Sequence, residues 1–320
     1  MAEDSSVNKH WSEINEKGAI LGMRIMFIIY KYLGRFPFYI ALLPVIGYFF
    51  LTNRAARNAS MDYISRVKRA GVEVGSGPAL WLSYRQFYSF GCSLVDKLAV
   101  WSGRITLQDL HFYGYEIFEQ YHRQNIGTVI IGSHLGNIEV CRALANQKGA
   151  LRINVLVHTK HAEKFNAMLK DVAGDSDVNL IQVTDIGPAT AMMLNEKIMQ
   201  GEHVVIAGDR TPVNGKNTCV AEFFGENAHF PRGPLILASI LKCPVFTMFC
   251  LREGTKYGFY VEKLFDKVEL PRKQRETELE SYISGYAKQL QKYCGKAPLQ
   301  WYNFYPFWND LNARRMLDEQ

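Results

Sequence analysis

The 320-residue sequence lacks the short motifs that mark several large enzyme classes. It contains no P-loop, no G-x-G-x-x-G dinucleotide fingerprint, no G-x-S-x-G nucleophile elbow and no H-E-x-x-H zinc motif. These absences argue against a nucleotide-dependent enzyme, a serine hydrolase and a zinc protease. They leave direct group transfer, in which a general base activates one substrate to attack another.

The six cysteines show neither C-x-x-C spacing nor a Cys/His metal pattern. Most of them fall within apolar runs, as Cys243 and Cys250 do. We therefore interpret them as reduced packing residues, and we expect the catalytic part of the chain to face the cytoplasm. No metal and no cofactor are expected.

The apolar run at residues 36–51 carries no charge, but its 16 residues are slightly short for a spanning helix, and Pro37 and Pro44 interrupt it. Residues 1–70 hold 10 Lys+Arg against 5 Asp+Glu, whereas residues 71–320 hold 27 against 26. The net charge of +6 therefore belongs mainly to the N-terminal part. Basic residues beside an apolar segment attract anionic lipid, and we expect no nucleic-acid partner.

We predict that residues 18–52 form a helical membrane anchor, either a kinked span or a hairpin in one leaflet. The alternative is a helical cap buried on the globular core. A signal peptide is disfavoured, because residues 1–17 are polar and acidic and no small-residue cleavage site closes the apolar run.

From residue 127, apolar runs of strand length alternate with helical patterns. This alternation favours an α/β fold, with a mainly parallel or mixed central sheet flanked by helices and an N-terminal membrane-embedded helical segment. We expect one α/β domain over residues 53–320, with a helical part at 53–126 and a sheet-forming part at 127–308. The predicted strands are 128–131, 153–157, 180–183, 204–207, 245–251 and 258–262, and the predicted helices are 54–70, 80–101, 138–147, 162–172, 188–199, 233–241 and 273–293. An amphipathic helix is predicted around His111, and an aromatic edge strand at 300–308.

Residues 128–139, TVIIGSHLGNIE, place His134 on the loop after a buried strand, where open α/β sheets bind ligands. His134 is the candidate general base, and Glu139 is the candidate carboxylate that orients it. The same spacing recurs at His111/Glu116 and His158/Glu163, so it proves nothing alone. Only His134 lies on a glycine-bracketed turn, and the alternative is a satisfied loop histidine.

A second strand, in VVIAGDRT, leads to Asp209 and Arg210. An unpaired buried charge is costly, so these two are expected in the same crevice as His134. Arg210 would bind a phosphate or carboxylate, and Asp209 would orient Arg210 or a substrate hydroxyl. The alternative is a structural Asp–Arg pair.

The remaining substrate-binding candidates are loop residues. Backbone N–H groups at the start of the following helix, near Gly136, would hold an oxyanion. The segment FFG…FPRGP is predicted as an aromatic loop leading into a helix, either lining an acyl-chain pocket or simply packing. The candidates are Gly136, Asn137, His158, Asp209, Arg210 and Arg232.

With these residues placed, the chain resembles the lysophospholipid acyltransferase superfamily, specifically the bacterial branch of lipid A late acyltransferases. The matching features are the apolar N-terminal segment, GSHLGNIE, AGDRT, FFG…FPRGP, CPVF and the terminal aromatic segment. The resemblance implies an acyltransferase on the cytoplasmic face of the bacterial inner membrane, with His134 as base and Glu139 as its partner. The chain lacks the E-G-T-R form of glycerol-phosphate acyltransferases, which argues against that acceptor.

The expected reaction moves a fatty acyl group from a thioester, on acyl carrier protein or coenzyme A, to a hydroxyl or amine of a membrane lipid. The thioester is a co-substrate, acyl carrier protein is the expected partner, and no covalent enzyme intermediate forms. Two alternatives remain open, a non-enzymatic lipid-binding or scaffold protein on the same fold and a lipid hydrolase.

Overall fold

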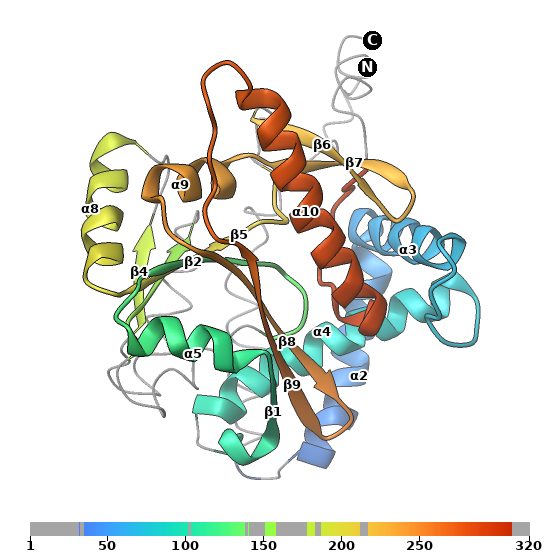
Figure 1. The fold of residues 1–320 in the computed structure, drawn as a ribbon. Helices are drawn as coiled ribbons and strands as arrows, with labels where there is room; N and C mark the ends of the chain where they lie inside the picture. Colours follow the sequence, from blue (N-terminus) through green and yellow to red (C-terminus); the bar gives the residue numbers. More distant parts are fainter. Residues whose placement is uncertain are drawn as a thin grey trace, which may run out of the picture.

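The structure, a computed structural model, describes residues 32, 35–101, 104–137, 140, 151–157, 178–182, 187–211 and 217–308. Its elements are labelled in Figure 1. The helices are α2 (Arg35–Thr52), α3 (Arg54–Arg69), α4 (Ala79–Trp101), α5 (Tyr115–Arg123), α8 (Pro188–Met199), α9 (Gly233–Leu241) and α10 (Arg275–Lys296), with 3-10 turns η2 (Leu107–Asp109) and η3 (Pro298–Gln300). The strands are β1 (Leu110–Tyr113), β2 (Thr128–Gly132), β3 (Ile153–Val157), β4 (Val178–Gln182), β5 (His203–Ala207), β6 (Thr218–Phe223), β7 (Glu226–Pro231), β8 (Val245–Glu253) and β9 (Lys256–Phe265).

The centre of the molecule is a seven-stranded sheet in the order β1-β9-β8-β2-β5-β3-β4. All neighbouring strands are parallel except β8 and β9. The predicted α/β class and mainly parallel sheet are confirmed. The register pairs Gly132 of β2 with Ala207 of β5, so the loops after these two strands begin side by side.

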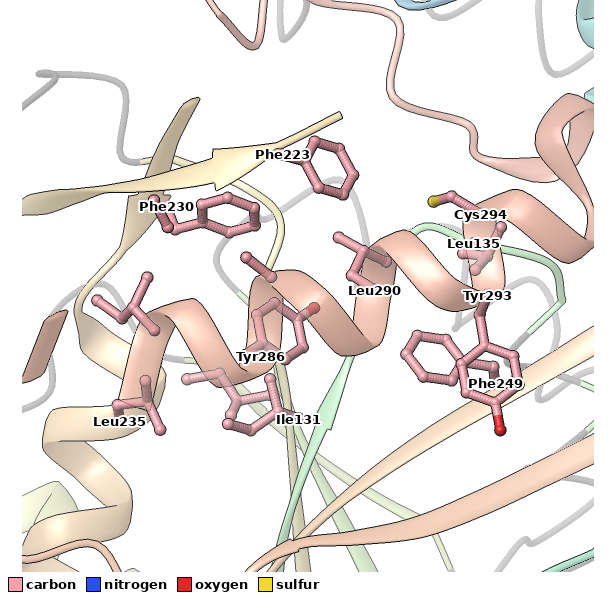
Figure 2. Packing of buried hydrophobic residues seen from close by; sticks show 14 of the residues in the cluster. Ile131, Leu135, Phe223, Phe230, Leu235, Phe249, Tyr286, Leu290, Tyr293 and Cys294 are labelled. Atoms are coloured by element: carbon pink, nitrogen blue, oxygen red, sulfur yellow. The ribbon is translucent and has the colours of Figure 1, made fainter. Parts of the chain in front are cut away.

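The two faces of the sheet pack against different cores. Side chains alternate along a strand, so Val129 and Ile131 join one buried cluster while Ile130 joins the other. The first cluster includes α9, α10 and the β6–β7 hairpin, and the second includes α2, α4 and α5. Figure 1 shows α10 crossing the sheet, and Figure 2 shows Tyr286 and Leu290 of this helix among its buried contacts. Because both faces are covered, the central strands are almost continuously apolar, as parallel sheets require.

Helix α2 is apolar on two sides. Phe38, Leu42, Ile46 and Phe50 are buried in the second cluster, close to α4. Gly91 of α4 allows the close approach, since a Cβ there would lie 2.8 Å from Cδ1 of Ile46.

The opposite side of α2 is exposed. Its exposed apolar residues are Ile40, Leu43, Val45, Tyr48, Phe49 and Leu51. Among the described residues no single helix is long and apolar enough to cross a membrane. The pair Pro37–Thr52 and Arg54–Arg69, bent by 94°, passes that test only together. The predicted membrane anchor at 18–52 therefore stays a prediction.

Two segments differ from their predicted structure. The region around His111 is not a helix, because β1 pairs in parallel with β9 and Gly114, with φ +70°, separates β1 from α5. The expected helical part at 53–126 thus contributes an edge strand to the sheet. The FFG…FPRGP segment is the β6–β7 hairpin instead of a loop, with positive φ at both Phe224 and Gly225.

The terminal aromatic segment returns to the core, as predicted, but it does so without forming an edge strand. After η3, Trp301 makes an isolated bridge to Leu135, and Trp301 is fully buried. The helices predicted at 138–147, apart from residue 140, and at 162–172 lie outside the described residues.

A buried histidine at the start of β5 makes a first prediction, on acid stability. His203 is fully buried, with its ring nitrogens 2.9 Å from Thr128 Oγ1 and 3.3 Å from His122 Nδ1. Burial, and next the charge of His122, lower the pKa of His203 to about 3. The folded protein therefore keeps this ring neutral at pH values where the unfolded chain protonates it, so stability falls as the pH drops below about 6.5.

We expect His203→Gln to lose less stability than wild type on acidification. The difference should be about 3 kcal/mol between pH 7 and pH 4, measured by urea unfolding. His111→Gln, which changes an exposed histidine, is the control and should behave as wild type. Equal losses in wild type and His203→Gln would contradict the prediction.

Candidate active site

The site is built where β2 and β5 end. Gly132 is the last residue of β2, Gly208 directly follows β5, and the N–H of Gly208 donates to the carbonyl of Gly132 at 2.9 Å. A Cβ on Gly208 would lie 2.5 Å from Ile131 and 2.6 Å from the ring of Tyr286, so the close packing at position 208 requires glycine. The Tyr286 hydroxyl also donates to the carbonyl of Gly132, at 2.8 Å. The loops carrying His134 and Asp209 are thereby held together.

Asp209 pairs with His134. Oδ1 of Asp209 lies 2.8 Å from Nδ1 of His134, and Oδ2 accepts from the backbone N–H of His134, also at 2.8 Å. The carboxylate has no exposed surface, whereas the His134 side chain is 39% exposed. With Nδ1 bound to Asp209, Nε2 is the ring nitrogen left to meet a substrate.

The carboxylate is held ionised despite its burial. Burial alone would raise the pKa of Asp209, but the charge of His134 and hydrogen bonds from its ring, its N–H and the Trp301 indole outweigh burial and lower that pKa. A buried carboxylate on Nδ1 fixes the tautomer in which Nε2 accepts a proton. This is the geometry of a general base.

The position of Asp209 differs from its expected role. It was expected to orient Arg210 or a substrate hydroxyl, and it instead lies behind His134 with both oxygens occupied by His134 and Trp301. The Arg210 guanidinium lies over the Tyr305 ring at 5.2 Å, and its buried Nε has no hydrogen-bond partner within the described parts of the chain. Asp209 and His134 do lie in contact, but the fully buried Asp209 does not face a crevice.

The backbone N–H groups of residues 134–137 are all hydrogen-bonded inside the protein. Gly136 donates to the carbonyl of Gln300 at 2.9 Å, and Asn137 donates to that of Cys250 at 2.8 Å. Leu135 donates to the Ser133 hydroxyl at 3.2 Å. The N–H groups of Gly136 and Asn137 are therefore not free to hold the expected oxyanion, and residues 138 and 139 of the expected helix start lie outside the described residues.

Gly136 and Asn137 instead have structural contacts. Gly136 has φ +73°, and a Cβ there would lie 2.0 Å from the carbonyl oxygen of Cys250, so only glycine fits. The buried Asn137 amide donates to the carbonyl of Ser93 in α4 at 2.9 Å. These contacts fix the path of the loop that carries His134.

The other predicted site residues lie elsewhere. Arg232 forms an ion pair with Glu276 of α10. Glu139 and His158 lie outside the described residues. Phe223 and Phe230 are buried against α10, on the side of the helix away from Ile131 in Figure 2, which for these rings favours packing over an acyl-chain pocket.

Trp301 was missed as a site residue. Its indole Nε1 donates to Oδ2 of Asp209 at 2.9 Å. Tyr305 lies on the same segment, and its hydroxyl donates to the backbone carbonyl of Asp209 at 3.0 Å. The only sequence signal was the aromatic run itself, which does not reveal a partner 92 residues away.

A half-exposed histidine, backed by a buried carboxylate at the carboxyl edge of a mainly parallel sheet, defines an α/β enzyme of the general-base class. The family model described as bacterial lipid A biosynthesis acyltransferase matches residues 85–310. The chain belongs to this family, and it is an acyltransferase that acts on a lipid. No curated protein matches the chain.

Proposed function

We propose that this protein transfers a fatty acyl group from an acyl thioester to a hydroxyl or amine of a lipid A-like acceptor, with His134 as general base. The supporting observation is the 2.8 Å contact between Nδ1 of His134 and Oδ1 of the buried Asp209. The donor is acyl carrier protein or coenzyme A carrying the acyl chain, and the site faces the cytoplasm at the bacterial inner membrane.

The reaction needs no covalent enzyme intermediate. Nε2 of His134 takes the proton of the acceptor O–H or N–H as the acceptor atom attacks the thioester carbonyl carbon. The C–S bond then breaks, and the leaving thiolate takes the proton from Nε2. Asp209 keeps its negative charge and stabilises the imidazolium that forms between the two steps.

Arg210 is the residue that binds an anionic group of the substrate. The N–H groups of residues 134–137 are bonded within the protein, so an anionic group of the substrate has to be met by another donor. Arg210 follows Asp209 directly and has an Nε without a partner among the described residues. A guanidinium binds phosphate or carboxylate in a bidentate manner.

The test is lipid mass spectrometry on membranes from cells with and without the gene. We expect one lipid species to lose an acyl chain in the deletion and to regain it when wild type is restored. In a purified assay, acyl-carrier-protein and coenzyme A thioesters are supplied separately to identify the donor. Unchanged lipids under conditions where the protein is made would count against the proposal, and free fatty acid released without acceptor would favour a hydrolase.

The exposed side of α2 supports membrane contact. Ile40 and Leu51 are 53% and 71% exposed, and Leu80 and Trp81 at the start of α4 are each 52% exposed. Arg57, in the first turn of α3, donates to the carbonyls of Phe50 and Leu51 at the end of α2. We propose that this apolar side inserts among lipid acyl chains beside a basic flank.

We expect Leu51→Glu to weaken binding to phosphatidylethanolamine/phosphatidylglycerol vesicles by about tenfold, because it places a charge where an exposed apolar side chain would insert among the lipid acyl chains. Sedimentation with vesicles measures the bound fraction. Ile117→Glu on α5, a residue of comparable character that is 47% exposed, is the matched control and should bind as wild type. Equal binding by all three proteins would rule out α2 as the contact.

A further inference from the structure

Trp301 contacts the catalytic pair from behind. Its side chain is fully buried, and its indole N–H donates to Oδ2 of Asp209 at 2.9 Å. The same oxygen accepts the backbone N–H of His134, while Oδ1 is left for the His134 ring. Trp301 thus helps to set the rotation of the carboxylate that presents Oδ1 to Nδ1.

The indole also changes the basicity of the carboxylate. Burial raises the pKa of Asp209, and the Trp301 hydrogen bond is one of the contacts that reverse this effect. A hydrogen bond to a charged acceptor is about twice as strong as one between neutral groups. The donor therefore weakens the hold of Asp209 on the proton that it shares with His134.

Trp301 is itself held from the helical side of the molecule. Its carbonyl accepts from the Gln86 amide in α4 at 2.6 Å, and the Gln86 carbonyl accepts from the Ser60 hydroxyl in α3 at 2.5 Å. Ser60, Gln86, Trp301 and Asp209 all have no exposed surface. A continuous buried path of hydrogen bonds and covalent structure therefore runs from α3 to the catalytic pair.

We propose that Trp301 is a positioning residue, which orients Asp209 and tunes its basicity through the indole N–H, and that Gln86 fixes Trp301 for this purpose. The proposal rests on the proposed function in that His134 is taken as the base. Trp301 does not touch the substrate, so its loss affects turnover and proton affinity more than substrate binding.

The test compares Trp301→Phe with Trp308→Phe. Trp308 is a matched control, because its buried indole belongs to the same aromatic cluster but donates to the carbonyl of Phe223 at 3.2 Å. Two readouts are taken across pH 5 to 9. One is the pH dependence of kcat and KM, and the other is the rate at which diethylpyrocarbonate modifies His134, followed by mass spectrometry.

In Trp301→Phe we expect kcat to fall about tenfold with KM nearly unchanged, as for loss of one hydrogen bond to a charged group. The pKa of Asp209 rises without the donor, so the pair keeps its proton to higher pH. The acid limb of the rate profile and the modification curve of His134 should both move to higher pH. Trp308→Phe should leave both midpoints in place.

Unmoved midpoints in Trp301→Phe, or equal shifts in both variants, would overturn the proposal and leave Trp301 a packing residue. If Trp301→Phe does not fold, 3-benzothienylalanine at position 301 replaces it, because that side chain matches indole in shape and lacks the N–H. The modification curve does not require turnover. An inactive wild type would therefore defeat the proposed function, while the curve still decides the role of Trp301.

Discussion

Asp209→Asn lowers kcat by about 10³-fold or more, with KM changed little. An asparagine that keeps its oxygen toward the His134 N–H and the Trp301 indole points its NH₂ at Nδ1 of His134. Nδ1 then has to accept, so Nε2 carries the hydrogen and can no longer act as a base. Changes of this kind at a histidine–carboxylate pair cost about 10⁴ in kcat. Steady-state kinetics with a saturating acyl thioester measure the effect.

The matched control is Asp96→Asn. Asp96 is also buried, but it pairs with Arg252 at 3.6 Å instead of His134. Asp96→Asn therefore shows the effect of losing a buried charge alone, whereas Asp209→Asn also removes the ability of His134 to act as a base. A similar fall in kcat for both variants, or near-normal turnover in Asp209→Asn, would remove Asp209 from the mechanism.

His134 substitutions should have the largest effect on turnover. His134→Ala removes the base, and general-base catalysis contributes about 10² to 10⁴-fold. It also removes a donor from the fully buried Asp209, which costs about 1–3 kcal/mol of stability. His134→Asn is the better variant, because its amide can still donate to Asp209 while it lacks a base at the position of Nε2.

We therefore expect both His134 variants to be inactive, and His134→Asn to unfold closer to the wild-type temperature than His134→Ala. Acyl transfer and thermal unfolding are measured on the same preparations. His111→Ala, at an exposed position on β1, controls for histidine loss. Turnover near the wild-type rate in His134→Asn would show that another group takes the proton.

The elements with strong local signals were predicted well. The helices predicted at 188–199 and 233–241 match α8 and α9, both of which have proline in the first turn. The strand predicted at 153–157 matches β3. In these segments residues adjacent in the chain determine the boundaries, so a single sequence carries the information.

The misplaced elements depend on distant partners. The segment LHFY of β1 lies within a helical hydrophobic pattern, and only pairing with β9, far along the chain, makes it a strand. The β6–β7 hairpin turns through Phe224, which adopts φ +54°. Phenylalanine rarely adopts a positive φ, so the sequence does not predict a turn at this residue. Tertiary contacts outweighed local preference in both cases.

The site residues also fall into those that the local sequence predicts and those that depend on distant contacts. His134 could be selected locally, because its strand and its glycines are adjacent in the sequence. Its contact with Asp209, 75 residues away, needs the β2–β5 register. The spacing to Glu139 suggested a local partner instead, and Glu139 lies outside the described residues. Trp301 could not be found from spacing at all.

The bridge between Leu135 and Trp301 has a consequence for the order of assembly. During synthesis His134 and Asp209 emerge long before the segment that closes over them, and Asp209 lacks its indole donor until residue 301 has followed. In the nascent chain the Asp209 carboxylate therefore still lacks one of the hydrogen bonds that it has in the folded protein. The pair of His134 and Asp209 therefore gains its full set of hydrogen bonds only after residue 301 has been synthesised and has packed against Leu135.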